Sequence, residues 1–304
     1  MSTPDDKGLL LETRELTRLF GGGDHTVRAV DGVSFGVRPG EIVAIVGESG
    51  SGKTTLGRML LRLLDPTSGS VTFEGRDVTA MRNSRQLKHY WRGVQAVFQD
   101  PYAAFNQFYT IRHVMSNALN VLDGRISEKD KLPRIKKSLV EVGLDPEDVL
   151  DKWPHQLSGG QVQRVMIARA LVVGPRVLLA DEPTSMLDAS LRVTVLNLLT
   201  DLRKQYNMTI LFITHDLGQA YYVSDRILVM YHGQLVEQGP VEEVLENPQH
   251  EYTKRLMADV PLMHGRNSIL EEDALEAQRD EAWSLQKPSE EPEYRVMVHD
   301  TEQR

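Results

Sequence analysis

The sequence predicts an α/β protein with a buried, largely parallel sheet, flanking helices and an inserted, mostly helical segment. Short apolar runs, typical of strands buried on both faces, alternate with longer stretches of helical periodicity. Such alternation favours parallel strands joined by right-handed crossovers. Between residues 85 and 175 there are few strand signals and several helical ones, which indicates the insertion.

The first third of the chain predicts three strands and a helix. Residues 9–20 and 27–37 are alternating or β-rich and are separated by "GGGDH", so two strands joined by a loop are expected. The apolar run at 41–46 predicts a strand buried on both faces. Glycines follow at once, and "TTLGRMLLRLL" then has the periodicity of a helix.

The later part of the chain continues the pattern. "RVLLADEP" and "TILFITHD" predict two strands, and "SLRVTVLNLLTDLRKQY" predicts the helix between them. "RILVMYHGQLVEQG" predicts a hairpin that turns at His232 and Gly233. A short helix is expected in "PVEEVLENP", with proline in its first turn.

Composition excludes several classes of protein. The 304 residues are 40% hydrophobic and 26% charged, which is ordinary for a soluble globular chain. No apolar run approaches the roughly 20 residues needed to span a bilayer, and the polar N-terminus is unlike a secretory signal. The absence of cysteine excludes disulfides and thiolate zinc sites and fits a cytoplasmic protein. A net charge of −8 without a basic, aromatic-rich stripe argues against nucleic-acid binding.

A phosphate-binding loop is predicted at "GESGSGKT", which matches G-x-x-x-x-G-K-[ST] between a strand and a helix. Backbone N–H groups and the helix N-terminus would bind phosphate, Lys53 would neutralise β- and γ-phosphate oxygens, and Thr54 would be a Mg²⁺ ligand. A glycine-rich turn with a chance lysine is the alternative, and the flanking elements argue against it. The predicted loop residues are Gly47, Glu48, Ser49, Gly50, Ser51, Gly52, Lys53, Thr54 and Thr55.

Polar side chains follow three predicted strands, in "VLLADEP", "LFITHD" and "AVFQDP". Asp181 would hold Mg²⁺ and Glu182 would act as the general base for an attacking water, although both could simply cap a strand or helix. His215 could donate a hydrogen bond to the γ-phosphate, and Gln99 could touch Mg²⁺ or the attacking water. Neither His215 nor Gln99 is informative alone, but the carboxylates gain weight beside Lys53.

The order of these motifs resembles the nucleotide-binding subunit of ABC transporters. "GESGSGKT", Gln99, "LSGGQ", "LLADEP", "SMLD" and His215 follow one another as in that family, and the resemblance covers about residues 9–260. It implies a nucleotide-binding domain at 1–260 with a P-loop NTPase core, a RecA-like mixed sheet with flanking helices and an antiparallel β part. It also implies an inserted α-helical subdomain at about 85–175. The acidic extension at 261–304 has no counterpart that we can place.

The resemblance also implies a head-to-tail dimer with two ATP molecules between its subunits. Gln99 would link the γ-phosphate to the membrane partner, and His215 would clamp that phosphate. Phe20 would stack on adenine, with Val27 as a possible neighbour. The residues expected to face the nucleotide of the opposite subunit are Ser158, Gly159, Gly160, Gln161 and Asp188.

A narrower resemblance is to the ATPases of oligopeptide and dipeptide importers. It rests on "FQDPYAAFN", "WPHQLSGGQVQRVMIARAL" and "NPQHEYTKRLMADVP". This group also serves nickel and oligosaccharide importers. The chain departs from it at Gln107, where proline is usual in the region that meets the membrane partner, and at Met186, where alanine is common.

These resemblances imply the ATP-hydrolysing subunit of a peptide importer, at the cytoplasmic face of the membrane, with ATP and Mg²⁺ as cofactors. The implied partners are a second ATPase subunit (a related chain or a second copy), two membrane-spanning permease subunits and an extracytoplasmic substrate-binding protein. An oligosaccharide or nickel importer is the alternative within the group. A soluble ABC ATPase acting on nucleic acid or ribosomes is the alternative from another class, and the single cassette without coiled coils or zinc cysteines argues against it.

Overall fold

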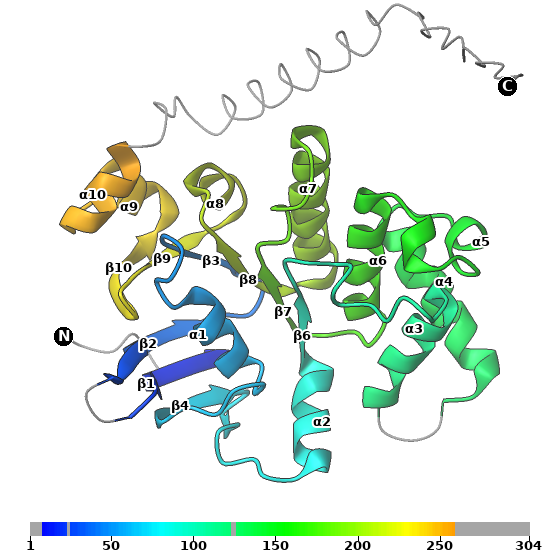
Figure 1. Ribbon diagram of the computed structural model, residues 1–304, viewed down its shortest axis with the longest axis horizontal. Coiled ribbons are helices and arrows are strands. Elements are labelled where there is room, and N and C mark those ends of the chain that lie inside the picture. Colours follow the sequence, from blue (N-terminus) through cyan, green and yellow to red (C-terminus); the bar gives the residue numbers. More distant parts are fainter. Residues whose placement is uncertain (1–7, 23–24, 123–125, 259–304) are drawn as a thin grey trace, which may run out of the picture.

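Two β-sheets and the helices around them make up the computed structural model, which describes residues 8–22, 25–122 and 126–258 (Figure 1). One sheet has four strands in the order β2-β1-β4-β5, and the other has six in the order β10-β9-β3-β8-β7-β6. This mixed α/β arrangement confirms the predicted fold class. The acidic extension expected at 261–304 lies outside the described residues.

The four-stranded sheet is antiparallel. β1 (Leu11–Phe20) pairs with β2 (Val27–Val37) on one side and with β4 (Ser68–Phe73) on the other, and β4 pairs with β5 (Arg76–Asp77). β1 and β2 are the two N-terminal strands that the sequence predicts. β4 and β5 lie in a stretch for which the sequence pattern makes no prediction.

The six-stranded sheet carries the longest buried strands. Its members are β3 (Ile42–Val46), β6 (Val94–Val97), β7 (Val177–Asp181), β8 (Thr209–Thr214), β9 (Arg226–Tyr231) and β10 (Gln234–Pro240). All pair in parallel except β10, which runs antiparallel to β9. The β9–β10 hairpin turns at His232 and Gly233, as the sequence predicts, and both residues have positive φ, as a type I′ turn requires.

β3 shows why the strands of this sheet have continuous apolar sequences. Ile42, Ala44 and Val46 face the apolar core shared with α7, α8 and the helical lobe, whereas Val43 and Ile45 face the core shared with α1 and the antiparallel sheet. Since both faces are covered, every residue of the strand is buried. Segments that leave its carboxyl end therefore emerge at one edge of the sheet.

The helices fall into two groups. Around the sheets lie α1 (Lys53–Leu60), α2 (Ser84–Gly93), α7 (Ala189–Tyr206), α8 (Leu217–Val223), α9 (Val241–Glu246) and α10 (Glu251–Ala258). A separate lobe beyond β6 (Figure 1) contains α3 (Ile111–Ala118), α4 (Glu128–Glu141), α5 (Pro146–Val149) and α6 (Gly159–Leu171). Among the described residues, no helix combines the length and apolar character needed to cross a membrane.

The helical lobe is narrower than the segment predicted at about 85–175. α3, α4 and α6 contact one another, and α5 packs on α4. β6 lies inside the predicted range, yet it pairs with β7 as the edge strand of the main sheet. A strand before Gln99 is expected from "AVFQDP" and corresponds to β6, but so short a run does not by itself show that it joins the main sheet.

Candidate functional site

A cleft of about 860 Å³ lies at the carboxyl edge of the six-stranded sheet. Ligands bind at this edge in open α/β sheets because the loops after parallel strands meet there. The sequence-predicted residues that line the cleft are Val27, Glu48, Ser49, Gly50, Gly52, Lys53, Thr54, Thr55, Gln99, Glu182 and His215. The cleft thus brings together the ends of β3, β6, β7 and β8.

Two glycines allow the backbone conformation of the phosphate loop. Gly47 and Gly52 have φ of 148° and 104°, a region that favours glycine. A Cβ at Gly47 would lie 2.2 Å from the carbonyl oxygen of Met230, and one at Gly52 would lie 2.3 Å from that of Ala29. The loop is therefore packed directly on backbone and ends at the N-terminus of α1, where N–H groups favour an anion.

Lys53 is the buried cation of the cleft. Its Nζ donates hydrogen bonds to the carbonyl oxygens of Gly47, at 2.6 Å, and Glu48, at 2.9 Å. Burial lowers the pKa of Lys53, while the charges of Glu182 and Asp181 oppose that shift. The two carboxylates thus help to keep the ammonium charged beside the phosphate loop.

Asp181 ends β7 with an unsatisfied acceptor. Its side chain is buried, and Oδ1 has no hydrogen-bond partner among the described residues. Burial raises the pKa of Asp181, the neighbouring Glu182 raises it further, and Lys53 opposes the shift. An orphaned carboxylate oxygen here, with the Thr54 hydroxyl lining the cleft, is a donor set that suits a hard cation such as Mg²⁺.

Glu182 is held by two other sequence-predicted side chains. Gln99 Nε2 donates to its Oε2 at 3.0 Å, and His215 Nδ1 lies 3.2 Å from its Oε1. Glu182 also has a φ of 46°, a conformation that a non-glycine residue rarely adopts and that is frequent at functional sites. Its backbone N–H donates to Ile213 on β8, which anchors this turn.

The Ser-Gly-Gly-Gln segment forms the N-terminus of α6. Ser158 is the N-cap: its Oγ accepts from the N–H of Gln161, and the Gln161 side chain accepts from the N–H of Ser158. This capping box leaves the first N–H groups of the helix, including that of Gly159, without a partner inside the helix. None of the residues 158–161 lines the cleft of its own chain.

Gly160 and Asp188 fix the relation of α6 to α7. A Cβ on Gly160 would come within 2.9 Å of the Leu191 side chain, so a larger residue there would require Leu191 to shift. Asp188 is the N-cap of α7 and accepts from the N–H of Leu191 at 3.0 Å. Asp188 likewise does not line the cleft, so the cross-dimer roles expected for these residues stay predictions.

Four predicted residues lie near the cleft without lining it. Gly47 and Ser51 belong to the phosphate loop, and Asp181 is the last residue of β7, directly before Glu182. Phe20 pairs with Val27 across β1 and β2, and the Arg18 guanidinium lies 4.7 Å from its ring centroid. Val27, and not Phe20, reaches the cleft, and the adenine-stacking role of Phe20 stays a prediction.

The sequence patterns missed four lining residues, namely Arg28, Ala29, His232 and Leu256. His232 comes from the β9–β10 turn, where the N–H of Gly233 donates to Ser51 at 3.0 Å and so ties the hairpin to the phosphate loop. The hairpin signal finds that turn but not its neighbour. Leu256, on α10, has no local signal at all.

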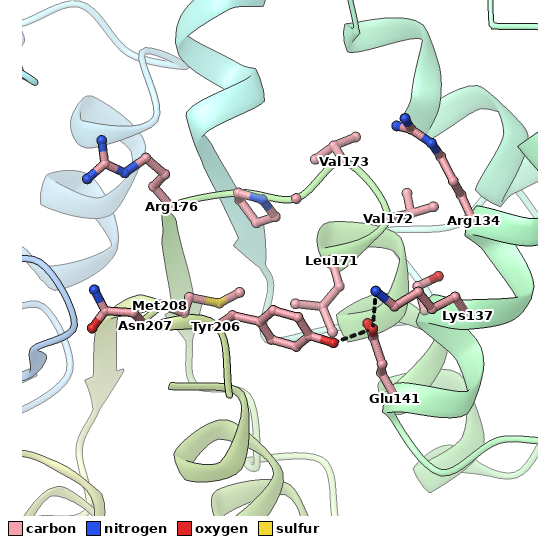
Figure 2. A pocket seen from close by; sticks show the side chains of 13 residues that line it. Arg134, Lys137, Glu141, Leu171, Val172, Val173, Arg176, Tyr206, Asn207 and Met208 are labelled. Atoms are coloured by element: carbon pink, nitrogen blue, oxygen red, sulfur yellow. Dashed lines mark hydrogen bonds and ion pairs between the residues drawn. The ribbon is translucent and has the colours of Figure 1, made fainter. Parts of the chain in front are cut away.

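A second cavity, of about 450 Å³, lies between the helical lobe and the main sheet (Figure 2). Arg176 and Met208, which line it, precede β7 and β8, so it lies at the amino edge, opposite the phosphate loop. Glu141 of α4 accepts from the Tyr206 hydroxyl and pairs with Lys137. Burial and the bond to Glu141 raise the pKa of Tyr206 to about 12. These contacts join the lobe to α7.

Comparisons with known proteins agree with the geometry of the cleft. A family model described as "ABC transporter" matches residues 30–185. The chain is 44% identical to the oligopeptide transport ATP-binding protein OppF of Bacillus subtilis over 83% of each chain. It is 41% identical to a putative peptide import ATP-binding protein of Brucella ovis, over 83% of this chain and 78% of that one.

A solved structure supports the same assignment. The dimeric, post-hydrolysis form of the ATP-binding cassette MJ0796, bound to ADP and Pi, superposes with a TM-score of 0.69 at 28% identity. The match covers 76% of this chain and 98% of that one. With the predicted phosphate loop, two strand-end carboxylates and these relatives in agreement, the chain belongs to the ABC transporter family, among the ATP-binding subunits related to those of peptide importers.

Proposed function

We propose that this chain is the ATP-hydrolysing subunit of an importer that carries oligopeptides or dipeptides across the cytoplasmic membrane. The observation that carries this proposal is the meeting of Lys53, Gln99, Glu182 and His215 in one cleft, with Asp181 behind them. The names of the relatives support the substrate class. An oligosaccharide or nickel importer remains the alternative within the same group.

The residues of the cleft have different roles in ATP hydrolysis. Loop N–H groups and Lys53 bind the phosphates of ATP, and Glu182 accepts a proton from water as its oxygen attacks the γ-phosphorus. Gln99 and His215 orient the Glu182 carboxylate. The bond between the γ-phosphorus and the oxygen that joins it to the β-phosphate breaks, which leaves ADP and phosphate. Thr54 and Asp181 would hold Mg²⁺, which when bound neutralises charge on the β- and γ-phosphate oxygens.

A head-to-tail dimer would give the α6 N-terminus its function. Residues 158–161 point no group into their own cleft, yet they present N–H groups and a helix dipole that favour an anion. In the proposed dimer, Ser158 and its neighbours contact ATP held by the opposite phosphate loop. Since each ATP then bridges two surfaces, it binds the closed state more tightly and shifts the population toward it.

Ser158→Arg tests this arrangement. The variant is expected to bind ATP with wild-type affinity through its own loop, but to lose hydrolysis because arginine blocks the partner's site. Mixing it with a Lys53→Ala chain should restore part of the activity, since one of the two sites then combines an intact loop with an intact α6. ATPase assays of each chain and of the mixture measure this. A mixture that dimerises but stays inactive would argue against the head-to-tail site.

We further propose that two permease subunits hold the chain at the cytoplasmic face of the membrane. A second ATPase subunit, either a related chain or a second copy, would complete the complex, and an extracytoplasmic binding protein would deliver the substrate. Gln107 and the largely exposed Phe108 lie in the segment expected to meet the permease. The exposure of Phe108 is compatible with such a contact, whereas Gln107 is half-buried.

The decisive experiment is purification of the native complex, its reconstitution into vesicles and ATPase assays with candidate substrates. Stimulation by peptides, together with their uptake, is expected. Stimulation by oligosaccharides or nickel alone would assign the chain to the alternative importers. Stimulation of the isolated chain by nucleic acid, without membrane partners, would instead favour the soluble ATPase.

A further inference from the structure

Helix α10, the last helix of the described residues, is fixed against the body of the domain at its beginning. The Glu237 carboxylate on β10 accepts hydrogen bonds from the N–H groups of Gln249, at 2.8 Å, and His250, at 3.0 Å. The N–H of Tyr252 in turn donates to His250 Nδ1 at 3.1 Å. These bonds set where α10 begins and which of its side chains face inward.

Tyr252 is the side chain of α10 that reaches the phosphate loop. Its hydroxyl accepts a hydrogen bond from the backbone N–H of Glu48, with the two atoms 2.8 Å apart. The ring is 1% exposed and stacks on Tyr231, with centroids 4.1 Å apart. Burial raises the pKa of Tyr252, so the hydroxyl stays neutral at physiological pH. One turn further along, Leu256 lines the nucleotide cleft.

The Gly47–Glu48 peptide group connects this contact to Lys53. Its N–H, on Glu48, donates to Tyr252, and its carbonyl, on Gly47, accepts from Lys53 Nζ at 2.6 Å. Because a peptide group is planar, fixing its N–H also fixes the direction of its carbonyl. The Tyr252 hydroxyl therefore helps to set the acceptor on which the Lys53 ammonium rests.

We propose that Tyr252 is a positioning residue for ATP binding, which acts from α10 on the first peptide group of the phosphate loop. The inference rests on the proposed ATPase function and goes beyond it by placing part of the nucleotide site outside the loop and strand-end motifs. Packing of the ring cannot account for this role. The stack on Tyr231 holds the ring, whereas only the hydroxyl bonds to the loop.

Tyr252→Phe tests the hydroxyl alone, since the ring and its stack are kept. Loss of one hydrogen bond that leaves a backbone N–H without its partner is expected to raise the Kd and KM for ATP about three- to tenfold. The kcat at saturating ATP should stay near the wild-type value, because Glu182, Gln99 and His215 are untouched. Equilibrium binding of ATP, steady-state kinetics and the melting temperature are measured together.

Tyr231→Phe is the matched control. It removes a hydroxyl from the partner ring, and that hydroxyl makes no hydrogen bond to any described residue. The control should keep the wild-type Kd. An unchanged Kd in Tyr252→Phe, or equal shifts in both variants, would overturn the inference. Failure of the wild-type chain to bind ATP would instead overturn the proposed function.

Amide hydrogen exchange tests the same bond without a variant. In the wild-type chain, the N–H of Glu48 should exchange more slowly than those of Ser49 and Gly50, which line the open cleft. In Tyr252→Phe this protection should be lost. Exchange of the Glu48 N–H as fast as its neighbours in the wild-type chain would contradict the proposal even if the variant failed to fold.

Discussion

Glu182→Gln is expected to bind ATP as tightly as the wild-type chain and to hydrolyse it at least about 100-fold more slowly, as loss of a general base predicts. Glutamine has the same shape, so it can still accept from Gln99, but it cannot take a proton from water. Lys53 and the phosphate loop are unaltered. The proposed ATP-bound dimer should therefore accumulate. Single-turnover hydrolysis and size-exclusion chromatography with ATP measure both effects.

Glu243→Gln provides the control for this variant. Glu243 lies exposed on α9 and does not line the cleft, so the same chemical change there should leave hydrolysis unaltered. If Glu182→Gln hydrolyses ATP at the wild-type rate, Glu182 is not the base. If it fails to bind ATP, the carboxylate has a role in holding the loop as well as in chemistry.

Lys53→Ala is expected to weaken ATP binding about 10- to 100-fold, the range for loss of a hydrogen bond to a charged group. The electrostatic reason adds to the lost contact. Without the ammonium, Asp181 and Glu182 remain as uncompensated carboxylates beside incoming phosphates. The Gly47 and Glu48 carbonyls also lose their donor. Calorimetric titration with ATP measures the affinity.

Lys88→Ala is the matched control for the loss of one positive charge. Lys88 is exposed on α2, away from the cleft, and its removal should leave the Kd for ATP unchanged. Unchanged affinity in Lys53→Ala would refute the assignment of the phosphate loop. Equal weakening in both variants would mean that net charge, and not the placement of Lys53, governs binding.

Much of the core could be predicted from sequence because its strands and helices have clear local sequence patterns. A strand covered on both faces must be apolar throughout, so β3, β7 and β8 stand out as continuous runs. β4 and the two-residue edge strand β5 are partly exposed or short, and their patterns are too weak to separate them from neighbouring loops. A strand before Gln99 is expected, but a run as short as β6 does not show which sheet it joins, so the predicted helical segment takes in one strand of the main sheet.

The sequence by itself determined the chemistry of this protein. It places a loop with Lys53 after one buried strand and two carboxylates after another, and the carboxyl ends of parallel strands lie at the same edge of a sheet. Only the tertiary structure decided what surrounds that chemistry. Tyr252 reaches the loop and Leu256 lines the cleft from some two hundred residues away along the chain, as the 204-residue separation of Tyr252 from Glu48 shows. The physical reason is that periodicity reports whether a face is buried, and not which distant element covers it.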